Sequence, residues 1–366
     1  MNKEFSRRFF IGSCLAAGAA AGCSSFGDDR RGRAWGGCDG RGKGPAATAD
    51  ASWMKGSIGI SSHWTSHTTA LDGSRPTYAE AVAGFDVEAY ASALEYAGAT
   101  HCIFTLAHAE QYLPFPLAEL ERILPGRTAK RDLVADLTKA LAARGIRFIA
   151  YYNHSCNGQD DPPWMEACGY SKAGAADMSR FAENIISIVA AIARRYGKAI
   201  DGWWFDSAPS VDPRGSEKSC IPFDVGDWHF PWDEFTAAAR SGNPGAVIAT
   251  NAGIYKNFTY TDKADYQAGE ATSLEDRFQP PADGIQRHHW AILDDDSWIL
   301  GSFPWGAGKF APTRFSDANV ISFLDRQISQ GQMTTFNLTT DITGKVNPWG
   351  VEQLHRCIGW FRRKIG

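Results

Sequence analysis

The chain has 366 residues, of which 44% are hydrophobic, 12% aromatic and 21% charged, and these proportions exclude collagen-like, low-complexity and fully disordered proteins. Its 37 basic and 41 acidic residues give a net charge of −4, so we expect no nucleic-acid partner and a neutral or weakly charged ligand. Beyond the N-terminus no apolar run approaches the ~20 residues that span a bilayer, so an integral membrane protein is not expected.

Residues 1–23 are typical of an export signal. The twin arginines Arg7 and Arg8 precede two phenylalanines and a mildly apolar stretch, 12–22, that is rich in Ala. An amphipathic first helix is the alternative, but this stretch has no polar face. Residues 20–23, Ala-Ala-Gly-Cys, are similar to a lipoprotein processing site, so Cys23 either carries a lipid anchor or follows a plain cleavage. We expect export by the twin-arginine route, with the protein periplasmic or membrane-anchored by lipid.

A flexible linker and one folded domain follow the signal. Residues 24–50 are rich in Gly and charge and nearly without apolar residues, whereas 51–366 can bury a core. The domain has an odd number of cysteines without paired C-x-x-C spacing, so we expect neither a metal nor another cofactor. Cys156 and Cys168 either pair as a disulfide or remain as small buried thiols.

Eight short β-rich runs alternate with helical patterns through the domain. The clearest helical patterns are 131–144, 178–196 and 348–364, where apolar residues recur at spacings of three and four. This alternation favours a (β/α)8 TIM-like barrel over a doubly wound sheet, and no G-x-G-x-x-G or P-loop motif supports a nucleotide fold. The runs are 57–64, 99–108, 146–154, 200–208, 246–253, 264–272, 289–294 and 333–341.

Polar and aromatic side chains gather where the predicted strands end. In a barrel these carboxyl ends meet at one face and hold the active site. A solvated rim would also be polar, but two carboxylates, three imidazoles and a Trp exceed what solubility requires. The residues are His63 and Trp64, His108, Asn153 and His154, Asp206, Asn251, Glu270, and Asn337.

The fourth strand carries the strongest candidate. Alternation puts Trp204 and Asp206 on one face and Trp203 and Phe205 on the other, so we expect Asp206 to point into the barrel. A carboxylate at the end of so apolar a strand favours a functional role over a helix N-cap.

A second carboxylate is needed for acid–base work, and Glu270 is the candidate. Asp265, Glu275 and Asp276 compete for this role. Two acids between aromatic walls suit glycoside hydrolysis, with one attacking the anomeric carbon and the other protonating the departing oxygen.

Several segments together resemble the barrel of the α-L-fucosidases, glycoside hydrolase family 29. They are Gly98-Ala99-Thr100-His101 with Thr105 and His108, the run 131–152, Trp204-Phe205-Asp206, the first strand ending in His63-Trp64, Phe85-Asp86, and Asn337. The resemblance implies a retaining exo-glycosidase that hydrolyses a terminal deoxy-sugar glycoside, with Asp206 as nucleophile and Glu270 as acid and base. The expected sugar contacts are His63, Trp64, His108, Tyr152 and Trp204.

The sequence also departs from that family. His108-Ala109 stands where two adjacent histidines are usual, and Glu110-Gln111-Tyr112 replaces Asp-Gly-Phe. The usual Glu-Trp-Tyr segment is absent near 71–75, the Arg common after the fifth strand is replaced around 251–253, and no C-terminal β-sandwich follows. The reaction class is therefore better supported than the substrate.

Two other kinds of protein remain open. A metal-dependent barrel hydrolase would use His63, His67, His108 or His154, although no histidine set has clear ligand spacing. A sugar-binding barrel that has lost catalysis would explain the altered sugar contacts. His288 and His289 receive no role, and a solvated loop is expected at 294–296.

Overall fold

The computed structural model describes residues 49–154, 160–170, 178–212, 228–275, 277–278, 285–294, 297–301 and 306–365, all within one compact unit, Lys43–Gly366. The predicted signal, 1–23, and nearly all of the linker, 24–50, lie outside these ranges. Cys156 also lies outside them, while Cys168 is buried. No helix among the described residues combines the length and the apolar character needed to cross a membrane.

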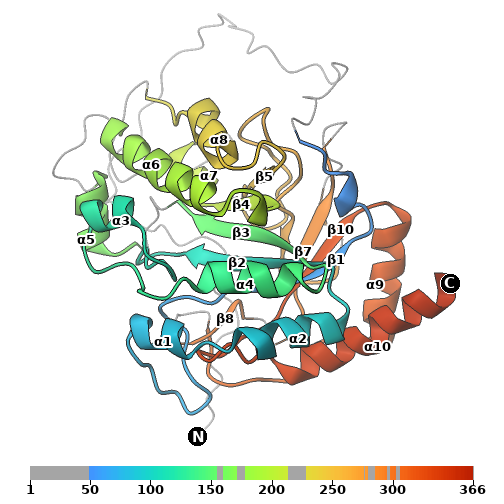
Figure 1. Ribbon diagram of the computed structural model, residues 1–366. Coiled ribbons are helices and arrows are strands. Elements are labelled where there is room, and N and C mark those ends of the chain that lie inside the picture. The colour runs from blue at the N-terminus through green and yellow to red at the C-terminus, as the bar shows by residue number, and fades with distance from the viewer. Residues whose placement is uncertain are drawn as a thin grey trace, which may run out of the picture. The chain divides into compact units, whose positions relative to one another are not determined.

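Eight parallel strands form one curled sheet (Figure 1). Their order is β5-β4-β3-β2-β1-β10-β7-β6, so consecutive strands of this sheet lie side by side except β5 and β6, which are its two edges, while β8 and β9 form a separate two-stranded pair. The strands are β1 (Ile58–Ser62), β2 (His101–Ala107), β3 (Arg147–Asn153), β4 (Gly202–Asp206), β5 (Val247–Thr250), β6 (Glu270–Ala271), β7 (His288–Ile292), β8 (Ile299–Leu300), β9 (Gly306–Ala307) and β10 (Met333–Asn337).

The prediction of a (β/α)8 barrel is confirmed in its strands and their order, but the sheet is not closed. Each of the eight predicted runs contains a parallel strand, yet no ladder joins β5 to β6 among the described residues. The predicted run 264–272 is reduced to two residues because Gly269, directly before Glu270, has a φ of 70°, which breaks the extended backbone. The sheet is an open barrel with a seam between β5 and β6.

Isolated contacts join the two sides of this seam. The backbone N–H of Asp265 donates to Ile248 O over 2.8 Å, and the indole of Trp204 donates to Ala268 O over 2.8 Å. The hydroxyl of Tyr266 donates to Trp203 O over 2.9 Å. Arg240 forms an ion pair with the fully buried carboxylate of Asp265. Isolated backbone contacts and three side-chain contacts therefore join this seam, where a continuous ladder joins the other strands.

Helices cover the outside of the sheet and account for the predicted patterns at 131–144, 178–196 and 348–364 as α4, α6 and α10. Between β5 and β6, and between β6 and β7, no helix occurs in the part of the chain that the structure describes. The helices are η1 (Ser52–Met54), α1 (Tyr78–Gly84), α2 (Val87–Ala97), α3 (Ala118–Ile123), α4 (Leu133–Ala142), α5 (Pro162–Cys168), α6 (Ser179–Tyr196), η2 (Gly197–Ala199), α7 (Ala208–Val211), α8 (Trp232–Arg240), α9 (Asp317–Ser329) and α10 (Pro348–Ile365).

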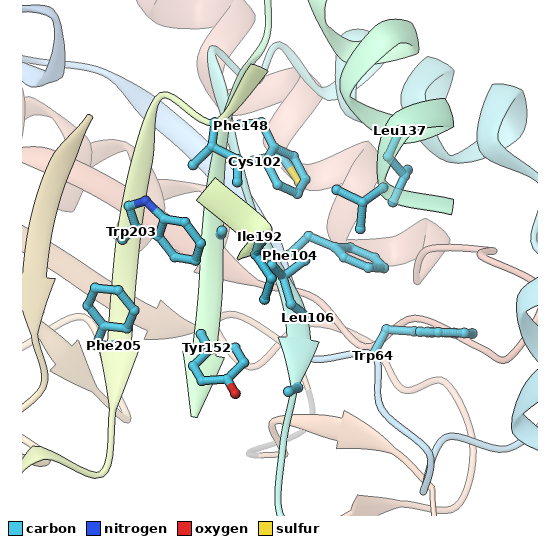
Figure 2. Packing of buried hydrophobic residues seen from close by; sticks show 14 of the residues in the cluster. Trp64, Cys102, Phe104, Leu106, Leu137, Phe148, Tyr152, Ile192, Trp203 and Phe205 are labelled. Atoms are coloured by element: carbon cyan, nitrogen blue, oxygen red, sulfur yellow. The ribbon is translucent and has the colours of Figure 1, made fainter. Parts of the chain in front are cut away.

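Two apolar cores lie on opposite faces of the sheet. The inner core fills the barrel and includes Trp204, Trp290 and Tyr151. The outer core packs the sheet against the helices, and Figure 2 shows Trp203 and Phe205 in it. The predicted alternation along the fourth strand is confirmed, because neighbouring residues of a strand point to opposite faces.

The ion pair at the seam gives a stability prediction. We expect Arg240→Ala to lower the free energy of unfolding by about 3–5 kcal/mol, because it removes the counter-charge from a buried carboxylate. The matched control is Arg356→Ala, which breaks the exposed pair with Asp317 and should cost about 0–1 kcal/mol. Chemical denaturation measures both. Equal losses for the two variants would contradict a structural role for the seam pair.

Candidate active site

Asp206 ends β4 and is surrounded by hydrogen-bond donors. Its Oδ1 accepts from the backbone N–H of Ser207 over 2.8 Å and from Nδ2 of Asn251 over 2.9 Å. Its Oδ2 accepts a short hydrogen bond from the hydroxyl of Tyr151. Three donors stabilise negative charge on this carboxylate and fix its orientation. The N-cap alternative does not hold, because the N-cap of α7 is Ser207, without a side-chain cap.

The backbone beside Asp206 is strained. Ser207 has a φ of 67°, in the left-handed region that residues other than glycine rarely adopt. The other non-glycine residues with positive φ among those described are Gln111 and Tyr255, in the loops that follow β2 and β5. All three lie past the carboxyl ends of strands, which is where strain typically accompanies a functional site.

Glu270 begins β6, across the open seam from Asp206. Its Oε2 accepts a hydrogen bond of 2.7 Å from Nδ2 of Asn251, the same nitrogen that donates to Asp206. Burial, and next the negative charge of Asp206, raise the pKa of Glu270 to about 8, whereas the hydrogen bond from Asn251 lowers it. Glu270 therefore keeps its proton at neutral pH.

One shared donor limits the distance between the two carboxyl groups. Asp206 Oδ1 and Glu270 Oε2 both accept a hydrogen bond from Nδ2 of Asn251. The distance between these two oxygens therefore cannot exceed the sum of the two hydrogen-bond lengths, 2.9 and 2.7 Å. These two oxygens are therefore closer than the roughly 6.5–9.5 Å that separates the carboxyl groups of inverting glycosidases. The structure thus brings the carboxyl groups of Asp206 and Glu270 within reach of one amide nitrogen.

Aromatic rings form the floor beneath Asp206. Tyr151 stacks on Trp204 with ring centroids 5.1 Å apart, and Trp204 meets Trp290 edge to face at 4.5 Å. Burial, and next the charge of Asp206, hold the pKa of the Tyr151 hydroxyl well above its ordinary value, so it remains a donor to that carboxylate. Trp204 lies where the sequence predicts, on the same face as Asp206.

The rings of His63 and His108 lie beside the ring of Tyr151. Their rings meet edge to face at 5.0 Å, and His63 contacts Tyr151 at 4.8 Å. Burial lowers the pKa of His108 to about 4, although the charge of Asp206 opposes this, and burial holds that of His63 well below its usual value. Both imidazoles are neutral at neutral pH and offer hydrogen-bonding groups without charge.

Two predicted sugar contacts lie on the wrong face of the sheet. Trp64 is fully buried in the outer core beside Phe104, and its indole donates to Asp341 O. Tyr152 is also in the outer core, where its hydroxyl donates to Gln111 (Figure 2). The predictions for these two residues are corrected by the pleat of the strand, which turns the preceding residue, Tyr151, into the barrel.

Tyr151 and Asn251 contact the two acids, although neither of them is predicted from the sequence to have a catalytic role. Asn251 was predicted to lie at the rim, but its contact with both acids could not be read from the sequence. The direction of Tyr151 follows from strand alternation, because it is two residues from Asn153 and therefore shares its face of the strand. In register, Tyr151 pairs with Trp204 and Asn153 pairs with Asp206.

The remaining candidates take structural positions. Asn337 binds the backbone carbonyl of Trp298, and Asn153 accepts from the hydroxyl of Ser207. Asp265 is paired with Arg240 across the seam, and Glu275 is exposed beside Arg277. Asp276 lies outside the described residues.

No group of three or more His, Cys, Asp or Glu able to hold a metal ion occurs among the described residues. His154 is enclosed by the rings of Phe230, Trp232 and Phe235 in the outer core. The predicted solvated loop is wrong at its first residue, because Asp294 is fully buried and accepts from Thr339 and Asn347.

A parallel barrel with one donor-rich carboxylate and one protonated carboxyl group at its strand ends has the arrangement of a glycoside hydrolase. The sequence matches the family Alpha-L-fucosidase over residues 47–364, and the chain belongs to that family. No curated protein sequence matches the chain significantly.

Solved structures with the same fold include two fucosidases. Alpha-L-fucosidase AlfC from Lactobacillus casei is 16% identical, with 84% of this chain and 96% of that one covered and a TM-score of 0.58. Alpha-L-fucosidase isoenzyme 1 from Paenibacillus thiaminolyticus is 17% identical, with 85% and 74% covered and a TM-score of 0.58.

An endo-fucoidan hydrolase of glycoside hydrolase family 107, MfFcnA4, is also similar. It is 17% identical, with 84% of this chain and 53% of that one covered and a TM-score of 0.60. The chain therefore spans about half the length of that relative. At these identities the similarity shows the fold.

The two neighbouring tyrosines of β3 give a direct test of which face carries the site. We expect Tyr151→Phe to lower kcat/KM for a glycoside about 10–100-fold, because it removes a hydrogen bond of ~1.5–3 kcal/mol to a charged group. Tyr152→Phe, the matched control, removes a hydroxyl from the outer core and should leave kcat/KM within about twofold. The same loss in both variants would contradict the assigned faces.

Proposed function

We propose that the protein is a retaining exo-glycosidase that hydrolyses a terminal α-L-fucoside or a closely related deoxy-sugar glycoside. The observation that carries the proposal is the carboxyl pair Asp206 and Glu270, both hydrogen-bonded to one amide nitrogen, with burial raising the pKa of Glu270 to about 8. Two carboxyl groups at this separation suit a double displacement, in which one acts as nucleophile and the other as acid and then base.

In the first step, Oδ2 or Oδ1 of Asp206 attacks the anomeric carbon while Glu270 gives its proton to the leaving oxygen. The raised pKa of Glu270, about 8, keeps that proton available at neutral pH. The hydroxyl of Tyr151 stays hydrogen-bonded to Asp206 and orients the attacking carboxylate. The bond to the leaving group breaks as the glycosyl–aspartyl ester forms.

In the second step, the ionised Glu270 takes a proton from water, and the resulting hydroxyl attacks the anomeric carbon of the ester. The ester no longer carries the negative charge of Asp206, which removes one of the two causes that raise the pKa of Glu270. The pKa of Glu270 is therefore higher before the ester forms, when Glu270 has to hold its proton, than afterwards, when it has to accept one. The cycle ends with Asp206 free and Glu270 protonated again.

The family and the walls of the site support a deoxy sugar. Trp298, which lies beside His63, presents an apolar ring against which a methyl group can pack, while the buried rings of Tyr151 and Trp204 support the site from beneath. Neutral His63 and His108 can hydrogen-bond hydroxyl groups without introducing charge. Fucosidases and an endo-fucoidan hydrolase share this fold, and the family favours removal of a terminal residue.

We also propose export by the twin-arginine route, with Cys23 as a lipid anchor. The support is the sequence around Arg7, Arg8 and Cys23. Cell fractionation tests it: protein that remains in the cytoplasm would contradict export, and protein found unanchored outside it would contradict the lipid.

Variants of the two acids test the reaction. We expect Asp206→Asn to abolish turnover of aryl α-L-fucosides, because an amide cannot form the ester. Glu270→Gln should lower kcat/KM, which reports the first step, about 10²–10⁴-fold for poor leaving groups and much less for good ones, because only poor ones need the acid in that step. Steady-state kinetics on a panel of aryl glycosides measures both effects.

The matched control is Glu275→Gln, which alters an exposed acid and should leave turnover within about twofold. Full activity in Asp206→Asn would contradict the nucleophile. An equal loss for good and poor leaving groups in Glu270→Gln would contradict the acid. Binding of fucose without turnover by the unaltered protein would instead indicate a sugar-binding barrel, and turnover that is lost with a chelator would indicate a metal hydrolase.

A further inference from the structure

The two acids belong to strands that no backbone ladder connects. Asp206 is on β4 and Glu270 is on β6, and the seam between β5 and β6 lies between them. In a closed sheet continuous backbone ladders would connect β4 to β6 through β5. Here another contact must set the distance between the two acids.

Asn251, directly after β5, lies at this point. Its Nδ2 donates to Asp206 Oδ1 and Glu270 Oε2, at 2.9 and 2.7 Å. Among the hydrogen bonds of the described residues, no other side chain contacts both acids. The backbone contact from Tyr255 N–H to Glu270 O, at 2.8 Å, ties the same loop to β6 but does not touch either carboxyl group.

The orientation of the Asn251 amide is fixed on its other side. Its Oδ1 accepts from the backbone N–H of Gly253 over 3.0 Å, so the nitrogen has to face the acids. Gly253 has a φ of 100°, a conformation open to glycine, which this turn requires. The backbone N–H of Asn251 donates to Phe205 O over 2.8 Å, which ties the residue to the end of β4.

We propose that Asn251 is the positioning residue of the carboxyl pair: its neutral amide holds Asp206 and Glu270 together across the open seam while leaving the proton on Glu270. The inference rests on the proposed function, since it assigns how that reaction's two acids are held.

The neutrality of the amide is what lets one proton remain on the pair. A guanidinium or ammonium at this position would stabilise the ionised form of both carboxylates and strip Glu270 of its proton. An amide satisfies one oxygen of each acid but leaves the repulsion between them. The negative charge of Asp206 therefore still raises the pKa of Glu270.

The same two N–H groups serve both steps of the reaction. While Asp206 is the nucleophile, one N–H of the Asn251 amide binds its Oδ1 and the hydroxyl of Tyr151 binds its Oδ2. Together these two hydrogen bonds fix the orientation of the carboxylate. While Asp206 is esterified, the other N–H stabilises the ionised Glu270, which is then the base. Asn251 itself transfers no proton.

The experiment compares Asn251→Ala with Asn251→Gln and Asn243→Ala. Asn243 is the matched control, because its Oδ1 also accepts from the N–H two residues on, that of Gly245, while its Nδ2 binds Ile200 O away from both acids. Two quantities are measured in the full chain: the titration of the Glu270 carboxyl by ¹³C NMR, and the pH dependence of kcat and KM for an aryl α-L-fucoside.

We expect Asn251→Ala to raise the pKa of Glu270 above its value of about 8, because it removes a donor that favours the charged form. The alkaline limb of kcat then moves to higher pH, and kcat at its maximum falls about 10–100-fold with a smaller change in KM. Asn251→Gln, which keeps the amide on a longer side chain, should restore the titration but only part of kcat. Asn243→Ala should change neither quantity.

An unchanged titration of Glu270 in a folded Asn251→Ala protein would overturn the inference. So would a fall in kcat without any shift of the alkaline limb, since that is what a merely structural role predicts. If the unaltered protein cleaves no glycoside while the Glu270 titration still moves in Asn251→Ala, the positioning role is supported and the proposed function fails.

Discussion

The structure depends on keeping two carboxyl groups close together across a break in its sheet. Asp206 and Glu270 stand on β4 and β6, on either side of a seam that no backbone ladder closes. Like charges at about 5 Å repel strongly where water is scarce, so the pair is stable only when one member keeps a proton and both are hydrogen-bonded. The raised pKa of Glu270 and the shared amide of Asn251 meet these two conditions.

The rest of the site follows from that pair. Burial and the charge of Asp206 raise the pKa of Glu270, and the aromatic floor of Tyr151, Trp204 and Trp290 supports the residues around Asp206. The seam itself is stabilised below the site by the Arg240–Asp265 ion pair and by indole and phenol groups that bind carbonyls across it. The Arg240–Asp265 ion pair thus lies at the amino end of the seam, and the carboxyl pair Asp206 and Glu270 lies at its carboxyl end.

Much of this arrangement could be predicted from the sequence, because it depends on local patterns. Alternation along 203–206 is a property of any strand, so the inward direction of Asp206 and Trp204 follows once the strand is recognised. The assignment of Tyr152 failed for the same reason, since an error of one residue along a strand reverses the face. Tyr151 would have followed from counting back two residues from Asn153.

The open seam could not be predicted in this way. It depends on the positive φ of Gly269 and on contacts between residues far apart in the chain, such as Trp204 with Ala268. The role of Asn251 depends in turn on the seam, because an amide that joins two acids has meaning only when their distance is known.

The stereochemistry of hydrolysis tests the account most directly. ¹H NMR of the first sugar released from an α-L-fucoside, recorded before mutarotation, distinguishes the two anomers. We predict α-L-fucose as the first product, because two successive inversions at the anomeric carbon retain its configuration. Release of β-L-fucose would contradict the account, since a single displacement by water has no need of an aspartate within reach of the anomeric carbon.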